Sequence, residues 1–234
     1  MKSSANPGRF VGLLYAAISI PGFFALIYVP TKVIVQGNAA ATASNIVSHE
    51  TLFRLGIASQ LISQILFMWV ALALYDLLKG VDARRASLML ALIVVSIPIA
   101  LLNELNALAA LGLARGADFL LVFTESQRDA LAMLFINLHN RGFDIAEIFW
   151  GLWLFPLGLL VYRSGFFPRI LGVLLMISCC AYVVDAFVPM VLPQYIQAVS
   201  RWTSPLRLGE LIFMLWLLIM GAKPKRLAFS QDRM

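Results

Sequence analysis

Apolar residues fill six long runs of this chain, and short polar stretches separate them. The runs lie near residues 10–29, 52–78, 87–112, 142–162, 170–192 and 205–221. A helix needs about 20 mostly apolar residues to cross the hydrocarbon core of a bilayer, and each run has roughly that length. The pattern therefore predicts an all-α integral membrane protein, in which a bundle of six transmembrane helices forms a single domain over residues 1–234.

The two longer connections, 30–51 and 113–141, have room for structure of their own. The second contains an amphipathic piece, which either lies on the membrane surface or extends the fourth helix outward. Its apolar residues are Leu131, Leu134, Phe135 and Leu138. Prolines stand inside four of the runs and predict kinks there, at Pro21, Pro98, Pro156 and Pro189.

Composition supports the membrane class, because 61% of the residues are hydrophobic, only 13% are charged and the mean hydropathy is +0.88. Eleven of the 18 Lys and Arg residues fall in the two terminal tails and in the second and fourth connections. Under the positive-inside rule this distribution predicts that both termini are cytoplasmic. The net charge of +6 then mostly reflects topology, so we expect the lipid bilayer as a partner and no nucleic acid. Protein partners are not predicted.

Polar residues inside the runs gather toward the face opposite the termini. Every run from the second to the sixth contributes to this set, which comprises Gln60, Ser63, Gln64, Asn103, Glu104, Asn106, Asp144, Glu147, Asp185, Arg207 and Glu210. A charged side chain at the centre of a bilayer costs about 2.5–3.5 kcal/mol and usually faces the bundle interior or a cavity. We therefore predict an outward-facing polar cavity whose ligand-binding residues are Asn103, Glu104, Asn106, Asp144, Glu147 and Glu210. The alternative is that these residues only join helices to one another.

Helical spacing indicates which polar residues share a face. One face of the fourth helix, if that helix begins early, is expected to be buried and carries Asn137, Asn140, Asp144, Glu147, Gly151 and Gly158. A shared face of the second helix carries Gly56, Gln60, Ser63 and Gln64. Glu104 is the deepest acidic residue of the set, so we expect it to be protonated or held by a donor such as Arg54, Arg207 or His139. The small residues from Ala39 to Ile46 predict a short outer helix over the cavity.

Metal chemistry finds little support in the pattern. Residues of a type that suits zinc occur near the outer face, namely His49, Glu50, Glu104, His139, Asp144 and Glu147. The chain has only two histidines and lacks HExxH and CxxC motifs. His139 also lies about 140° around a helix from Asp144, so the two do not share an ion easily. We therefore expect no metal site and no cofactor, and no catalytic residue is assigned.

Two further features concern the surroundings of the cavity. Trp150 and Trp153 lie about one turn apart and could form an apolar cavity wall with Phe149 and Phe155, but we favour packing against lipid. Arg207 and Glu210 have the i,i+3 spacing of an ion pair on one helix.

Short motifs spread along the chain carry a resemblance to a known family. They are Tyr28-Val29-Pro30, Asn38 to Ile46, Leu52 to Gly56, Leu102 to Asn106, Ile148 to Gly158, Ser164-Gly165-Phe166 and Gly209-Glu210. Together they resemble the bacterial membrane-protein family numbered 4386 among domains of unknown function, over nearly the whole chain. The resemblance implies a multi-pass protein of the bacterial plasma (inner) membrane, and it implies no activity, cofactor or catalytic residue.

From these features we expect a non-enzymatic membrane protein that binds or transports a small molecule or lipid headgroup at its outer face. Two alternatives stay open. The first is an intramembrane hydrolase or transferase, with or without a metal, that uses the carboxylates and His139 as acid, base or ligands. The second is a structural subunit that stabilises a partner. The sequence predicts neither the ligand nor the oligomeric state.

Overall fold

The computed structural model describes residues 6–222, and over these residues it consists of helices and the turns between them. The elements are α1 (Pro7–Phe23), η1 (Phe24–Tyr28), α2 (Val29–Val33), α3 (Ala39–Ser48), α4 (Glu50–Leu78), α5 (Ala83–Arg115), η2 (Asp118–Leu120), α6 (Glu125–Leu152), α7 (Leu154–Arg163), α8 (Arg169–Val191), η3 (Pro193–Tyr195), α9 (Ile196–Leu206) and α10 (Leu208–Ile219).

Six spans within residues 6–222 are long and apolar enough to cross a membrane. They are Pro7–Val33, Glu50–Leu78, Ala83–Arg115, Glu125–Arg163, Arg169–Val191 and Pro193–Ile219. The predicted all-α bundle of six transmembrane helices is thereby confirmed. The side of the membrane on which the termini lie stays a prediction.

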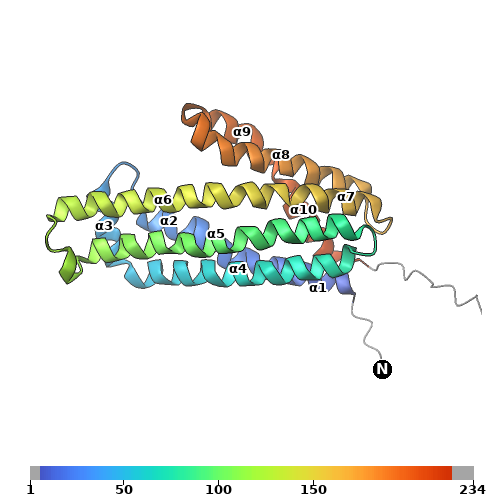
Figure 1. The fold of residues 1–234 in the computed structure, drawn as a ribbon, viewed down its shortest axis with the longest axis horizontal. Coiled ribbons are helices and arrows are strands. Elements are labelled where there is room, and N and C mark those ends of the chain that lie inside the picture. The colour runs from blue at the N-terminus through green and yellow to red at the C-terminus, as the bar shows by residue number, and fades with distance from the viewer. Residues whose placement is uncertain (1–5, 223–234) are drawn as a thin grey trace, which may run out of the picture.

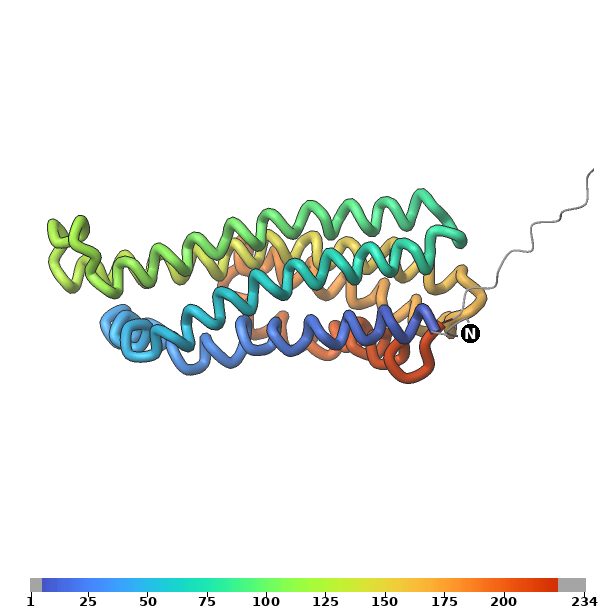
Figure 2. Tube along the Cα trace, turned by 90° about the horizontal axis from the view of Figure 1, so that it is seen from below, coloured from blue at the N-terminus to red at the C-terminus, as the bar shows by residue number. Residues whose placement is uncertain are grey.

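The spans pack in a closed circuit. α1 packs against α4, α4 against α5, and α5 against α6 and α7. α6 and α7 pack against α8, and α8 packs against α10, which returns along α1 (Figure 2). α1 begins and α10 ends at one end of the bundle, which we call the terminal end (Figure 1). The end of α5 and the start of α6 form the opposite end, which we call the distal end.

The first span changes its hydrogen bonding near its middle. The N–H of Val29 donates to the carbonyl of Phe24, five residues earlier, so η1 is a π-helical segment between two α-helical ones. Pro21 and Pro30 stand on either side of η1, and neither has a backbone N–H with which to continue the α-helical pattern. Such π segments are often found at functional sites.

The fourth span begins far earlier than residue 142. α6 starts at Glu125, where the Thr124 hydroxyl accepts from the N–H of Gln127 and the Gln127 side chain accepts from the N–H of Thr124. The amphipathic piece therefore extends the fourth helix and does not lie separately on the membrane surface. The helix is interrupted at Trp153 because Pro156 has no N–H to donate to the carbonyl of Leu152.

The helices that form the distal end are longer than a bilayer core is thick. α5 has 33 residues, which makes it about 50 Å long at about 1.5 Å per residue. The hydrocarbon core of a bilayer measures about 30 Å, so α5 and its neighbour α6 reach beyond it. The short helix expected from Ala39 to Ile46 is α3, and it packs against both α5 and α6.

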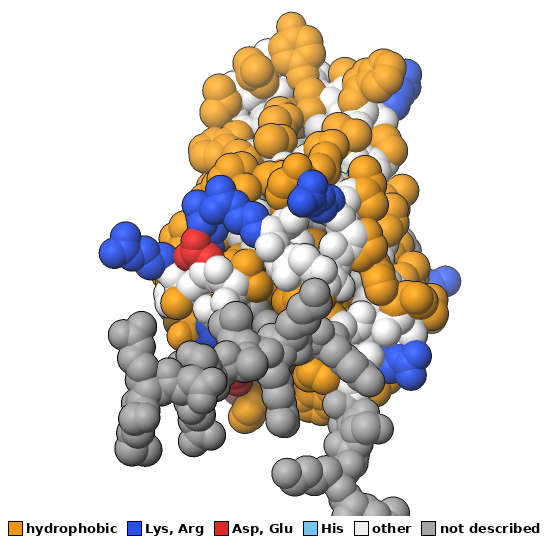
Figure 3. Space-filling view, turned by 90° about the vertical axis from the view of Figure 1, so that its right-hand side faces the viewer, with side chains coloured by type: hydrophobic (Ala, Val, Ile, Leu, Met, Phe, Trp, Pro, Cys, Tyr) orange, Lys and Arg blue, Asp and Glu red, His pale blue; other side chains and the backbone are white. Residues whose placement is uncertain are grey.

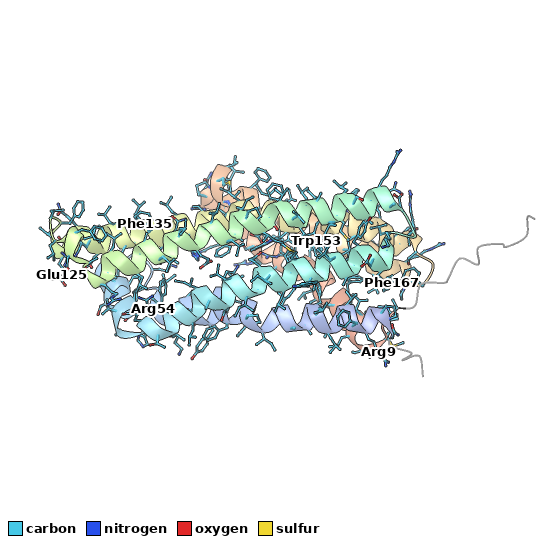
Figure 4. All side chains as sticks on the ribbon, turned by 60° about the horizontal axis from the view of Figure 1, so that its bottom comes forward. Arg9, Arg54, Glu125, Phe135, Trp153 and Phe167 are labelled. Atoms are coloured by element: carbon cyan, nitrogen blue, oxygen red, sulfur yellow. The ribbon has the colours of Figure 1, made fainter. Side chains whose placement is uncertain are left out.

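Trp153 fills the middle of the bundle at the interruption between α6 and α7 (Figure 4). Its side chain is fully buried, and its ring is edge-on to Tyr15 and Phe67, with centroids 6.3 and 5.5 Å away. From Trp153 a continuous apolar core extends to the terminal end and includes Leu74, Leu78, Met89, Leu157, Leu160 and Leu217. Apolar side chains therefore pack the inside of the circuit on this side of Trp153.

The face of the fourth span that was expected to be buried is buried only in part. Gly151 and Gly158 pack closely against α8, and a Cβ on Gly158 would lie 2.7 Å from the carbonyl oxygen of Gly172. Asn137 and Asn140 are exposed, so for them the expectation is wrong. The reason is that this part of α6 packs against α3 and α5 with its other sides, including the buried Ala132 and Ile136.

The terminal end carries basic side chains. Figure 3 looks onto this end and shows Lys and Arg around it, with apolar side chains covering the flanks. The helix ends there contribute Lys79, Arg84, Arg85, Arg163 and Arg169. This distribution is the one on which the predicted cytoplasmic placement of the termini depends.

Candidate functional site

Two cavities adjoin between the apolar core and the distal end. The first measures about 360 Å³ and lies between η1, α2, α4, α5 and α6. The second measures about 450 Å³ and lies between α1, α4, α6, α8 and α10. Leu26, Gln60, Trp150 and Arg207 line both, so the cavities meet at these four residues. Pockets that bind small molecules typically measure about 300–1,000 Å³, and each cavity falls in that range.

Glu104 lines the first cavity from α5 and pairs with a histidine of α6. Its Oε1 lies 3.1 Å from Nε2 of His139, and its side chain is only 4% exposed. Among the donors expected for this carboxyl group, the structure therefore selects His139. The ring of His139 also stands edge-on to Phe143, whose centroid is 4.7 Å away, and Phe143 lines the same cavity.

Asn103 and Asn106 stand behind this pair and join α5 to α6. The Asn103 amide donates to the carbonyl of His139 at 2.7 Å, and the Asn106 amide donates to Oδ1 of Asn103 at 3.0 Å. The Asn103 side chain lies directly over Gly142, where a Cβ would collide with its amide group. Neither asparagine lines the first or the second cavity, and their contacts are those of a helix–helix junction that holds His139 in place.

Arg207 brings three helices together at the point where the cavities meet. It stands at the interruption between α9 and α10, and its Nη2 lies 2.7 Å from Oε1 of Glu147 on α6. Its Nη1 lies 3.2 Å from Oδ2 of Asp185 on α8, and its guanidinium group covers the Tyr182 ring at 4.0 Å. The expected ion pair between Arg207 and Glu210 is therefore wrong, because the guanidinium group turns toward α6 and α8 instead.

Glu210 lines the second cavity together with Tyr15, Tyr182 and Arg207. The hydroxyl group of Tyr15 donates to Oε1 of Glu210, which links α10 to α1. Asp144 lines the first cavity nearer the distal end, where Oδ2 lies 3.0 Å from Nη1 of the exposed Arg141. Each of these carboxyl groups thus has a partner inside the described part of the chain.

Several buried polar atoms on the cavity walls have no hydrogen-bond partner within residues 6–222. They are both amide atoms of Gln60, Oε1 of Gln64 and the indole nitrogens of Trp150 and Trp153. Gln60 is 2% exposed and lines both cavities, while Gln64 and Trp153 line the second. A buried polar group without a partner costs about 1–3 kcal/mol, so these atoms call for a bound molecule or water in the cavities. Trp150 and Trp153 are cavity walls, and the lipid-facing role favoured for them is wrong.

The predicted site residues lie in three different places in the structure. Glu104, Asp144 and Glu147 line the first cavity, Glu210 lines the second, and Asn103 and Asn106 lie behind the first. Within the described residues no three His, Cys, Asp or Glu side chains lie close enough together to hold a metal ion.

Sequence reasoning missed Tyr15 and Tyr182, because hydroxyl groups on aromatic rings do not stand out from an apolar run. For Tyr15 a signal existed in the spacing of Gly8, Gly12 and Tyr15, which places all three on one side of α1.

Comparison with known proteins identifies a family but indicates no activity, ligand or catalytic residue. A family model described as "Domain of unknown function (DUF4386)" matches residues 10–221. An uncharacterized protein of Archaeoglobus fulgidus is 38% identical over 80 residues, which are 34% of this chain and 46% of that protein. The chain thus matches less than half the length of this relative. No solved structure matches.

Proposed function

We propose a function from the site itself, because the chain belongs to the DUF4386 family, whose description assigns no activity. The protein binds a small amphiphile, and the polar head of this molecule lies in the two adjoining cavities. The head is that of a lipid or of a lipid-like small molecule. In the predicted orientation the cavities belong to the outer half of a bacterial plasma membrane, with both termini in the cytoplasm. The six apolar spans and the position of the cavities among them support this proposal.

The observation that carries the proposal is a flank of the second cavity that is both apolar and exposed. Phe23 and Leu26 of the first span and Leu208 and Leu211 of α10 line this cavity, and between 41% and 59% of each side chain is exposed. Side chains that line a cavity and also face outward mark its rim. On a transmembrane span the surroundings of that rim are lipid, so an acyl chain can pass between α1 and α10.

The opposite wall of the same cavity offers polar partners. The Gln60 amide, Oε1 of Gln64 and the indole N–H of Trp153 are buried there without partners inside the described chain. A polar head that reaches them would satisfy groups that otherwise cost stability. An apolar rim and an unsatisfied polar wall together suit a molecule with an apolar tail and a polar head.

Binding is favoured over passage across the membrane. The fully buried Trp153 and the core cluster behind it fill the bundle between the cavities and the terminal end. A transport path would require these side chains to separate. The pair of His139 and Glu104 on the cavity wall supports a second candidate, an intramembrane hydrolase or transferase in which His139 acts as general base.

The test replaces Gln60 by Leu, a residue of similar size without hydrogen-bonding groups. Native mass spectrometry of the purified full chain would measure how much phospholipid stays bound as detergent is raised. We expect Gln60→Leu to lose most of the bound phospholipid while its thermal stability stays equal or rises, because an unpaired amide has been removed.

Gln197→Leu is the matched control, since Gln197 is exposed on α9. This variant should bind phospholipid as the native chain does. Unchanged retention in Gln60→Leu, or no retained phospholipid in the native chain, would refute binding in these cavities. Hydrolysis of the added phospholipid by the native chain, lost in His139→Gln, would favour the enzyme instead.

A further inference from the structure

The charges around the cavities are unbalanced. Five carboxylates gather there, on Glu104, Asp144, Glu147, Asp185 and Glu210, and the guanidinium groups that pair with them belong to Arg141 and Arg207. Glu104 is paired with His139 and Glu210 with the hydroxyl group of Tyr15, neither of which is a fixed positive charge. A cation in the cavities would therefore meet more acidic groups than fixed positive charges.

Arg207 has little capacity left for an anion. One terminal nitrogen pairs with Glu147, the other pairs with Asp185, and a face of the group covers the Tyr182 ring. Binding a phosphate or carboxylate takes a free fork of guanidinium N–H groups or a lysine ammonium group. Among residues 6–222 no lysine lines either cavity, so an anionic head finds no free basic partner in this part of the chain.

Aromatic rings complete the surroundings that a cation prefers. Phe143 and Trp150 line the first cavity beside Glu104 and Glu147, with ring centroids 6.0 Å apart. Trp150 also lines the second cavity, where Trp153 and Tyr182 join it. Ammonium groups are attracted to the faces of such rings, and sites for quaternary ammonium ligands are built from them.

A second and independent observation indicates that a ligand belongs at this place. Gln60 lies where the two cavities meet, is 2% exposed and has no partner for either atom of its amide within residues 6–222. Its carbonyl oxygen accepts hydrogen bonds, as a carboxylate does. An ammonium head between Glu104 and Gln60 would bring a positive charge beside the carboxyl group of Glu104 and the carbonyl oxygen of Gln60, and a primary ammonium group would also donate to that oxygen.

We infer that the head recognised by this site carries an ammonium group, held by Glu104, Glu147 and the rings of Phe143 and Trp150. This inference rests on the proposed function and names its ligand class. The ammonium group belongs to an ethanolamine or choline phospholipid that enters through the apolar rim, or to a free cationic amphiphile. The tail lies along Phe23, Leu208 and Leu211.

Competition between phospholipids with the same acyl chains tests the inference. The full chain would be stripped of lipid in detergent and offered equal amounts of dioleoyl phosphatidylethanolamine, phosphatidylcholine and phosphatidylglycerol, with bound lipid read by native mass spectrometry. We expect each of the two ammonium lipids to exceed phosphatidylglycerol by about tenfold. In Glu104→Gln, which keeps an oxygen to accept from His139, the excess should fall to near unity.

Glu125→Gln is the matched control, since Glu125 is an exposed carboxylate at the distal start of α6, and it should keep the native preference. Lipid retained without preference, or a preference for phosphatidylglycerol, would overturn the ammonium inference and leave amphiphile binding standing. No retained lipid would remove both proposals. Displacement of bound lipid by dodecyltrimethylammonium bromide would support the inference with a free amphiphile as source, whereas a preference that this detergent leaves intact would support it with the bilayer as source.

Discussion

Arg207 shows how one residue of this site depends on the whole fold. Its partners Glu147 and Asp185 lie on α6 and α8, and Tyr182 lies under its guanidinium group. Sequence spacing pairs it with Glu210, because only neighbours along one helix are visible at that level. The long-range partners follow from the packing of α8 between α6 and α10, which no spacing rule predicts. For Glu104 the partner was among those predicted from the sequence, since His139 was one of the three expected donors.

Replacing Arg207 by Ala would leave two carboxylates of a half-buried cluster without a guanidinium group. Breaking a fully buried pair costs about 3–5 kcal/mol, and exposed pairs contribute much less. Because the Arg207 side chain is 35% exposed, we expect a loss of about 2–3 kcal/mol. Denaturant unfolding in mixed micelles would measure it, with Arg201→Ala on the exposed side of α9 as the control. A loss no larger than that of the control would contradict the role given to Arg207.

At the scale of elements, apolar patterning predicts the spans but not their interruptions. The start of α6 at Glu125 was only one of two alternatives. The division at Trp153 is caused by Pro156, and the effect of a proline on a span depends on the helices that pack against it. The division of the last span at Arg207 has no proline at that place, since Pro205 lies inside the end of α9. The exposed Asn137 and Asn140 show the same limit, because helical spacing gives a face and not what covers it.

The junction of α5 and α6 gives a test of how tightly these elements are fitted. A Cβ on Gly142 would collide with the Asn103 amide, so Gly142→Ala should destabilise the protein by about 1–3 kcal/mol through overpacking. Asn103→Ala removes the obstructing amide and should also destabilise, because the hydrogen bond to the His139 carbonyl is lost.

The double variant separates the two effects. Because Asn103→Ala removes the amide with which the new Cβ collides, Gly142→Ala should cost little in a chain that already carries Asn103→Ala, so the two losses should not add. Urea or guanidinium unfolding of all four chains would provide the cycle. Additive losses would mean that Gly142 and Asn103 do not contact each other.

At the scale of the whole molecule, the cavities and the basic residues lie on opposite sides of one apolar core. The sequence alone indicated this arrangement, because charge in a transmembrane span is costly and its positions are therefore informative. It did not indicate that Tyr15 brings the first span into the site, or that two cavities meet at Gln60. Those features arise from the closed circuit of the helices.

The predicted topology can be tested on bacterial cells that express the full chain. We expect a green fluorescent protein fused after residue 234 to fluoresce and an alkaline phosphatase at the same place to be inactive, because the C-terminus is predicted to be cytoplasmic. An alkaline phosphatase inserted in the distal connection near η2 should be active and serves as the control. The reverse pattern would place the cavities on the cytoplasmic side.

The glycines at the start of α1 have a mechanical consequence for the rim of the second cavity. Gly8 donates to the carbonyl of Ala222 at 3.1 Å, and Gly12 lies against the backbone of α10, so α1 is pinned near its base. Tyr15 holds α1 to α10 again through Glu210, and Phe23 lies eight residues beyond Tyr15, about 12 Å along the helix axis. A tilt of about 10° around this last contact would therefore displace the rim by about 2 Å. The anchored part of α1 acts as the pivot, and small rotations there are amplified where a hydrocarbon chain would enter.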